Sequence, residues 1–129
     1  MKYFVIPLCI FILFSCYIEK EINQYNLRYL ALGDSYTIGE GIEFEDNYPK
    51  QIVNKIFLID SVTVIAKTGW TTDELIDTLN NLQLDKFDVV SLLIGVNNQF
   101  RGYQIDKYVM EFENLLIRAI DYSKDKKNK

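Results

Sequence analysis

The sequence predicts an α/β protein with a parallel sheet. Three short apolar runs, at residues 28–32, 62–66 and 89–94, alternate with three segments in which apolar residues recur at helical spacing. Such alternation implies parallel strands joined by right-handed crossovers. The third run is apolar at nearly every position, which is typical of a parallel strand covered on both faces.

The first sixteen residues differ in kind from the rest. Met1-Lys2 gives a positive start, and Tyr3 to Phe14 carries no charge. This run is about a dozen residues long, against the roughly 20 needed to span a bilayer, so it indicates a signal peptide. It ends at Leu13-Phe14-Ser15-Cys16, which resembles the lipobox of bacterial lipoproteins, although Phe14 is bulkier than the usual residue.

We therefore expect residues 1–16 to be a lipoprotein signal peptide and Cys16 to carry the lipid that anchors the protein to a membrane of the bacterial cell envelope. The alternatives are a periplasmic or secreted protein, an uncleaved anchor, and a buried N-terminal strand. Cys9 lies inside the expected signal, so the mature chain would keep only Cys16 and no disulfide.

Residues 17–27 are then a polar tether, residues 28–122 a single domain and residues 123–129 a charged tail. The 14 basic and 18 acidic residues give a net charge of −4 and form no basic stripe, which excludes nucleic-acid binding. The hydrophobic share of 49% and the charged share of 25% indicate a globular domain rather than a disordered one.

The domain begins with a strand at Arg28 to Leu32, which leads into Gly33-Asp34-Ser35. Asn47 is expected to cap a helix with Pro49 in its first turn. The packed face of that helix is predicted to be Ile52, Val53, Ile56 and Phe57. The β-branched run Val62 to Ala66 predicts the second strand.

Thr71 and Glu74 have the spacing of a capping box, which predicts the start of the second helix. This helix is expected to bury Leu75, Ile76 and Leu79. After the third strand comes a last helix with one amphipathic stripe, made of Ile105, Tyr108, Val109, Phe112, Leu115, Leu116, Ala119 and Ile120. Three strands are few for such a fold, and the third would present a long hydrophobic edge.

One residue after each predicted strand is a candidate catalytic residue. Ser35 follows the first strand, Gly69 the second and Asn97 the third. The carboxyl ends of parallel strands are where open α/β sheets gather their ligands. Taken singly, these are an ordinary turn serine, a loop glycine with positive φ and a capping asparagine. Their occurrence together and in order favours a catalytic site.

The segments around these residues resemble the three motif blocks of the SGNH/GDSL hydrolases. Gly33-Asp34-Ser35-Tyr36-Thr37 is similar to block one, Ala66–Leu75 to block two and Ile94–Gly102 to block three. The resemblance runs from Leu30 to Ile120 and is nearest to the lysophospholipase-like esterase branch. It implies a flavodoxin-like three-layer fold, of which only the first three βα units are expected here. It implies no cofactor and no metal.

The resemblance also assigns roles to residues. Ser35 would be the nucleophile and its backbone N–H an oxyanion donor, with further donors from the Gly69 N–H and the Asn97 side-chain amide. Preorganised donors of this kind are worth ~3–4 kcal/mol each. Asn98 stands where the family has Asp, a position that supports the loop rather than the reaction.

Three residues near these motifs are candidates for substrate binding, namely Asp34, Trp70 and Arg101. Trp70 suits an acyl pocket or core packing equally well. Arg101 and Lys67 lie where an anionic head group would be attracted, or are simply solvated.

The acid–base half of the family's machinery is absent, because the 129 residues contain no histidine and the Asp-x-x-His block is missing. Loss of the histidine costs a serine triad on the order of 10⁶ in kcat. We expect a C-terminally truncated hydrolase for small-molecule or lipid acyl esters, nearly inactive in this form. The alternatives are a non-catalytic lipoprotein that binds acyl or glycan ligands, and a complementing chain that supplies the missing strands and histidine.

Overall fold

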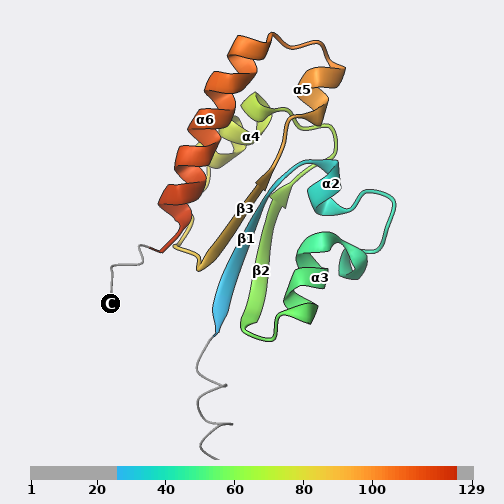
Figure 1. Ribbon diagram of the computed structural model, residues 1–129, viewed down its shortest axis with the longest axis vertical. Coiled ribbons are helices and arrows are strands. Elements are labelled where there is room, and N and C mark those ends of the chain that lie inside the picture. The colour runs from blue at the N-terminus through green and yellow to red at the C-terminus, as the bar shows by residue number, and fades with distance from the viewer. Residues whose placement is uncertain (1–25, 125–129) are drawn as a thin grey trace, which may run out of the picture.

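A computed structural model describes the structure of residues 26–124. Three parallel strands form one sheet in the order β2-β1-β3 (Figure 1). Their bounds are Leu27–Gly33 for β1, Ile59–Ala66 for β2 and Val89–Leu93 for β3. The expected signal peptide, the lipid anchor at Cys16, residues 17–25 of the tether and residues 125–129 of the tail lie outside the described residues.

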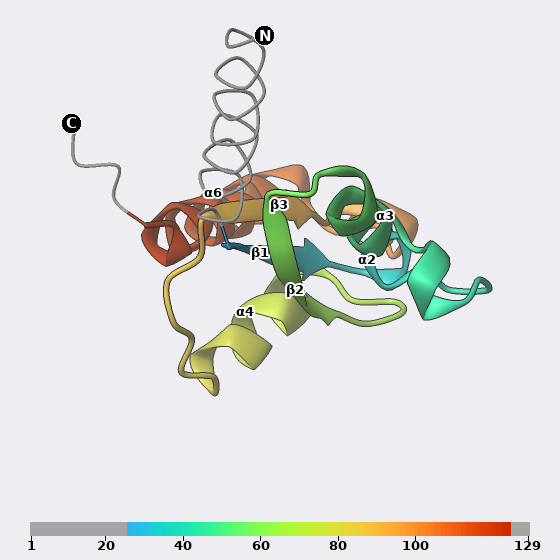
Figure 2. The same cartoon turned by 90° about the horizontal axis from the view of Figure 1, so that it is seen from below.

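Helices cover both faces of this sheet, which gives three layers (Figure 2). The helical elements are α2 (Ser35–Ile38), the 3₁₀ turn η1 (Phe44–Asp46), α3 (Tyr48–Lys55), α4 (Thr72–Asn80), α5 (Val96–Phe100) and α6 (Ile105–Tyr122). α3 packs on one face of the sheet, and α4 and α6 pack on the other. The predicted α/β class and parallel sheet are thereby confirmed.

The central strand β1 divides the core into two parts. Leu30 and Leu32 face α4 and α6 and are fully buried with Leu75 and Leu115. Tyr29 and Ala31 point to the other face, where they pack with residues of β2 and α3. Both faces of β1 are therefore buried from Tyr29 to Leu32, which explains why this part of the strand is continuously apolar.

The start of α3 is as predicted, but its end is not. The Asn47 side chain caps the helix by accepting the Lys50 N–H at 2.9 Å. The helix ends at Lys55, so Ile56 and Phe57 lie in the loop before β2 and are exposed, Phe57 by 75%. The prediction that these two residues belong to the packed face was wrong, because the helix ends before it can carry them onto the sheet.

α6 is also buried less than its stripe predicts. Leu115 and Ala119 are buried, whereas Ile105, Val109 and Ile120 are exposed. α6 packs against α4 and β3 along a narrow face, and no described strand lies beyond β3 to cover the rest. The helix α5 and the turn η1 were not predicted at all.

β3 forms one edge of the sheet. Val90 and Leu92 pack into the core beneath α6, while Val89 and Leu93 on the other face are exposed, Leu93 by 47%. The sequence predicts that both faces of this strand are covered, whereas the structure covers only the face with Val90 and Leu92.

Within residues 26–124 no helix is long and apolar enough to cross a membrane.

Candidate active site

The three candidate residues lie at one end of the sheet, where the strands end (Figure 1). Ser35 is the first residue of α2, directly after β1. Gly69 is in the loop between β2 and α4, and Asn97 is in α5 after β3. In the order β2-β1-β3, the connections diverge between β1 and β3, the topological switch point at which such sheets bind ligands. Ser35 and Asn97 therefore follow the two strands that flank this point.

The turn at Ser35 is fixed by its neighbours. The Asp34 carboxylate accepts the Tyr36 N–H at 3.0 Å and caps α2. Burial raises the pKa of Asp34, which is 1% exposed. A Cβ on Gly33 would lie 2.0 Å from the Thr37 hydroxyl oxygen and 2.4 Å from the Leu93 carbonyl oxygen, so only glycine fits there. The structure thus gives Asp34 a capping contact inside the turn.

The Gly69 segment is a tight turn held by groups from the third motif. The Trp70 N–H bonds to the Lys67 carbonyl at 3.2 Å, and Gly69 has φ of 80°, a conformation that glycine adopts without strain. Arg101 donates to the Gly69 carbonyl at 2.6 Å, and the Asn97 amide donates to the Trp70 carbonyl at 2.9 Å. These bonds fix the second motif relative to the third.

The Asn97 side chain keeps donor capacity after this contact. Its Nδ2 atom carries two hydrogens, and the bond to Trp70 uses one of them. Asn97 is half-buried, so the second hydrogen can be offered to a ligand. A free donor hydrogen is one of the requirements for an oxyanion donor.

Asn98 joins three helices beneath the site. It is 2% exposed, its Oδ1 accepts the Thr72 N–H at 3.1 Å, and its Nδ2 donates to the Thr72 hydroxyl at 2.6 Å. The same hydroxyl donates to the Glu111 carboxylate. The chain of bonds therefore runs from α5 through α4 to α6, and it gives Asn98 the supporting contacts expected for its position.

Arg101 and Trp70 both have partners within the protein. The carboxylate of Glu74 accepts the Thr71 N–H at 2.9 Å and pairs with Arg101 at 3.3 Å. The Thr71 N–H, followed by the Thr71 hydroxyl and Arg101, lowers the pKa of Glu74 despite partial burial. Trp70 packs against the core cluster beneath α4 and α6, and Lys67 is exposed. Arg101 thus binds the Gly69 turn and the capping box that follows it.

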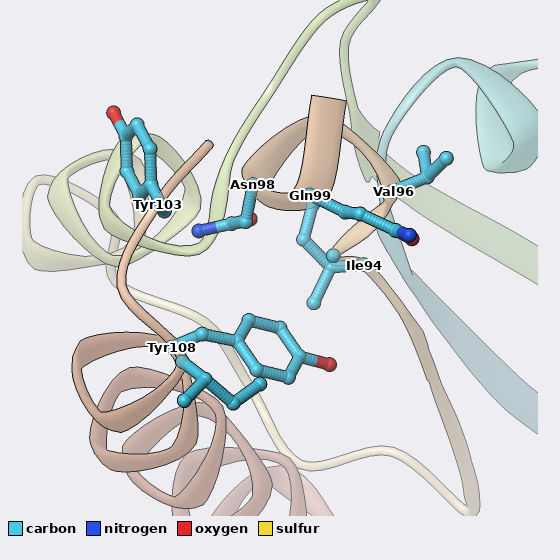
Figure 3. A pocket seen from close by; sticks show the side chains of 8 residues that line it. Ile94, Val96, Asn98, Gln99, Tyr103 and Tyr108 are labelled. Carbon is cyan, nitrogen blue, oxygen red and sulfur yellow. The ribbon is translucent and has the colours of Figure 1, made fainter. Parts of the chain in front are cut away.

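A hollow of about 490 Å³ lies beside α5 (Figure 3). Val96 and Gln99 of α5 line one side of it, and Tyr108 of α6 lines another. A Cβ on Gly95 would lie 2.7 Å from the Tyr108 ring, so the glycine allows the ring to approach the end of β3. Over the described part of the chain, no group of three or more His, Cys, Asp or Glu side chains could hold a metal ion.

Comparison with known proteins decides the family. The model of the GDSL-like lipase/acylhydrolase family matches residues 31–127, which include all three motifs. The chain belongs to the GDSL-like lipase/acylhydrolase family. No curated protein matches the chain.

Solved structures of GDSL and SGNH hydrolases share the fold. AlinE4, an SGNH-hydrolase family esterase, is 24% identical with a TM-score of 0.59, and 72% of this chain covers 55% of it. The psychrotrophic esterase EstA from Pseudoalteromonas sp. is 19% identical with a TM-score of 0.59. The match covers 75% of this chain and 55% of EstA. A G-D-S-L family protein from Desulfitobacterium hafniense DCB-2 is 18% identical with a TM-score of 0.64. The match covers 74% of this chain and 54% of that protein. The chain therefore spans about half the length of these structures.

Several residues of the GDSL site were not found from the sequence. Thr72 and Glu111 complete the network around Asn98. Thr72 lies within the second motif block but was not singled out, and no motif covers Glu111. Arg101 was expected to bind substrate rather than the Gly69 turn. Its position four residues after Asn97 offered a signal, because residues at this spacing lie on one side of a helix.

Proposed function

We propose that the protein is a serine esterase that hydrolyses acyl esters through an acyl-Ser35 intermediate. The observation that carries this proposal is that Ser35, Gly69 and Asn97 follow three adjacent parallel strands at one end of the sheet. The bonds from Asn97 and Arg101 to the Gly69 turn add rigidity to the two donor groups. Membership of the GDSL family supports ester hydrolysis as the reaction class.

In the proposed mechanism, the Ser35 hydroxyl oxygen attacks the ester carbonyl carbon and its proton passes to a base. The carbonyl oxygen becomes an oxyanion, which accepts hydrogen bonds from the Ser35 N–H, the Gly69 N–H and the Asn97 amide. The alcohol leaves with a proton. Water then attacks the acyl-serine carbonyl carbon, the bond to the Ser35 oxygen breaks, and the carboxylic acid leaves as the Ser35 hydroxyl is restored. Each donor contributes ~3–4 kcal/mol to stabilising the transition state.

The base in this mechanism does not come from a histidine of these 129 residues, because they contain none. Asp34 is a poor substitute, since its carboxylate is buried and occupied as a helix cap. An oxyanion hole and substrate binding alone retain roughly 10³–10⁴ over the reaction in water. We therefore propose that this chain alone acylates slowly and that an added base accelerates it.

The decisive experiment supplies the base from solution. The full chain is incubated with p-nitrophenyl acetate and with a fluorophosphonate, with and without imidazole, and the phosphonylated residue is located by mass spectrometry. We expect imidazole to increase both product release and labelling, and the label to be on Ser35. Ser35→Ala should lower both to the level of imidazole alone, because the nucleophile is gone.

Asn97→Ala tests the oxyanion donor. We expect a loss of about 10²–10³ in the imidazole-dependent acylation rate, as for other single oxyanion donors. Asn54→Ala, which removes an exposed amide from α3, is the matched control and should leave the rate unchanged. Equal rates in the Ser35→Ala protein and the parent would contradict the proposal.

The second candidate function is non-catalytic binding of acyl or glycan ligands at the same end of the sheet. The absence of histidine from the chain favours it. It predicts that a fluorescent acyl ester binds saturably to the full chain and is not hydrolysed, with or without imidazole. Turnover that depends on Ser35 would exclude it.

We further propose that Cys16 anchors the protein to a membrane of the cell envelope. The support is the apolar run before it and its similarity to a lipobox. The test is incorporation of a labelled fatty acid by cells that express the full chain. Cys16→Ala should abolish the label and Cys9→Ala should not, because only Cys16 is placed for modification.

A further inference from the structure

A buried chain of hydrogen bonds beside the candidate site begins at the backbone N–H of Thr72, in the first turn of α4. This group can only donate, and the Asn98 side-chain oxygen accepts its hydrogen at 3.1 Å. The Asn98 amide nitrogen therefore faces the Thr72 hydroxyl and donates to it at 2.6 Å. Thr72 is fully buried and Asn98 nearly so, which means that neither side chain can turn to water instead.

The hydrogen of the Thr72 hydroxyl goes to a third element. Its oxygen already accepts from Asn98, so the hydrogen has to be donated to a further acceptor. The Glu111 carboxylate of α6 accepts it at 2.5 Å, and the other carboxylate oxygen of Glu111 pairs with Lys107 at 3.4 Å. An ionised carboxylate has no hydrogen to donate, so Glu111 sets the direction of each bond back to Asn98.

This chain of bonds adjoins the donor groups of the candidate site. Asn98 follows Asn97 in α5, and Thr72 comes three residues after Gly69. The Asn97 amide bonds to the Trp70 carbonyl at 2.9 Å. Consecutive residues of α5 thus bond to the segment that leads into α4, and the second of these contacts is the one that the α6 carboxylate orients.

We propose that Glu111 is a positioning residue for the oxyanion donor Asn97, which it places through the Thr72 hydroxyl and the Asn98 amide. This inference rests on the proposed esterase function. What matters is the direction of the hydrogen bonds, so a chain with every direction reversed should place Asn97 equally well. Asn98→Asp combined with Glu111→Gln makes this reversal. The new carboxylate accepts both the N–H and the hydroxyl of Thr72, and the new amide donates to that hydroxyl and accepts from Lys107.

Each single variant should break the chain that the double variant restores. In Asn98→Asp, two carboxylates compete for the one hydroxyl hydrogen of Thr72 and repel each other. In Glu111→Gln, the one amide oxygen can accept from Thr72 or from Lys107 but not from both. We expect imidazole-dependent fluorophosphonate labelling of Ser35 in the full chain to slow by about 10- to 10²-fold in each single variant, as for a small misplacement of a reacting group. The double variant should label within about three-fold of the parent rate.

Two further measurements separate positioning from a purely structural role. The NMR signals of the Asn97 side-chain amide should shift in both single variants and return to the parent positions in the double variant. The melting temperature of Asn98→Asp should fall by about 5 °C or more, and that of the double variant should lie within about 2 °C of the parent. Glu113→Gln, at an exposed position of the same helix, is the matched control and should leave the labelling rate, the amide signals and the melting temperature unchanged.

Three results would overturn the proposal. The first is a double variant that recovers neither the Asn97 amide signals nor the melting temperature. The second is a set of single variants that lose stability while the Asn97 signals and the labelling rate stay at parent values, which would leave Glu111 a structural role only. The third is an equal effect of Glu113→Gln.

The same experiment keeps this inference apart from the proposed function. If the parent protein shows no labelling of Ser35, the proposed function fails, and the Asn97 signals and melting temperatures still decide whether Glu111 places this amide. If Asn98→Asp does not fold, Glu111→Gln and the double variant provide the comparison.

Discussion

Thr37 and Gly33 show how tightly the first turn of the site is packed. Thr37 is fully buried, and among residues 26–124 its hydroxyl oxygen finds no hydrogen-bond partner. That oxygen lies where a Cβ on Gly33 would be. A buried hydroxyl without a partner costs about 1–3 kcal/mol. The turn that presents Ser35 is thus held together at some cost in stability.

Replacing Thr37 by valine should therefore stabilise the protein. The methyl group has nearly the volume of the hydroxyl and needs no hydrogen bond, so we expect the free energy of unfolding to rise by about 1 kcal/mol. Chemical denaturation of the full chain measures the change. Thr63→Val, at an exposed position on β2, is the control and should change stability by less than about 0.5 kcal/mol. A loss of stability in Thr37→Val would show that the hydroxyl has a partner in solution.

Tyr29 predicts how stability depends on pH. Burial raises its pKa to about 12, more strongly than its hydrogen bond with Ser91 at 2.7 Å lowers it. The unfolded chain releases this proton near pH 10 and the folded chain near pH 12, so stability falls as the pH rises between them. We expect a loss of roughly 2–3 kcal/mol over this interval relative to Tyr29→Phe, which has no proton to lose. Denaturation curves at pH 9 and pH 12 for both proteins measure the change in the free energy of unfolding. An equal change in the parent and in Tyr29→Phe would contradict the raised pKa of Tyr29.

At the level of elements, the contact between α5 and the start of α4 organises the site. Asn97, Asn98 and Arg101 bond to backbone or side-chain groups of residues 69–74. The second and third motifs are thus held together by side-chain hydrogen bonds between elements. In α5 the apolar residues Val96 and Phe100 are exposed, and the buried residue is Asn98, which is hydrogen-bonded to Thr72.

Asn98→Asp, which restores the residue usual in the family, should destabilise this protein. The new carboxylate could not donate to the Thr72 hydroxyl and would be buried near Glu111. We expect a loss of about 1–3 kcal/mol at pH 7. Burial would raise the pKa of the carboxyl group, so the loss should shrink as the pH falls through that value. Asn54→Asp on the exposed side of α3 should have little effect on stability. An equal loss of stability in that variant would show that burial at position 98 is not the cause.

Local signals explain which elements the sequence predicts. The Asn47 cap and the capping box at Thr71 are formed by residues three apart, so their spacing is enough to locate the starts of α3 and α4. α5 is only five residues long, too short for periodicity to show. In α6, periodicity shows which residues share a face but not what covers that face.

For the whole molecule, the sequence predicts the parallel sheet but not the order of its strands. Order depends on crossovers, and the local pattern of a strand does not encode its neighbour. The candidate residues Ser35, Gly69 and Asn97 follow from their positions after strands. The bond between Arg101 and Gly69 joins residues 32 positions apart, and no short motif reports such a contact.

The two faces of β3 provide a final test of the architecture. Leu92 packs into the core under α6, whereas its neighbour Leu93 is exposed on the opposite face. Leu92→Thr should therefore lower the free energy of unfolding by about 2 kcal/mol or more, because it removes buried apolar volume and adds a buried hydroxyl. Leu93→Thr should change it by less than about 0.5 kcal/mol. Denaturation of the two single variants in the full chain measures the difference. An equal loss in both would mean that the outer face of β3 is covered in solution.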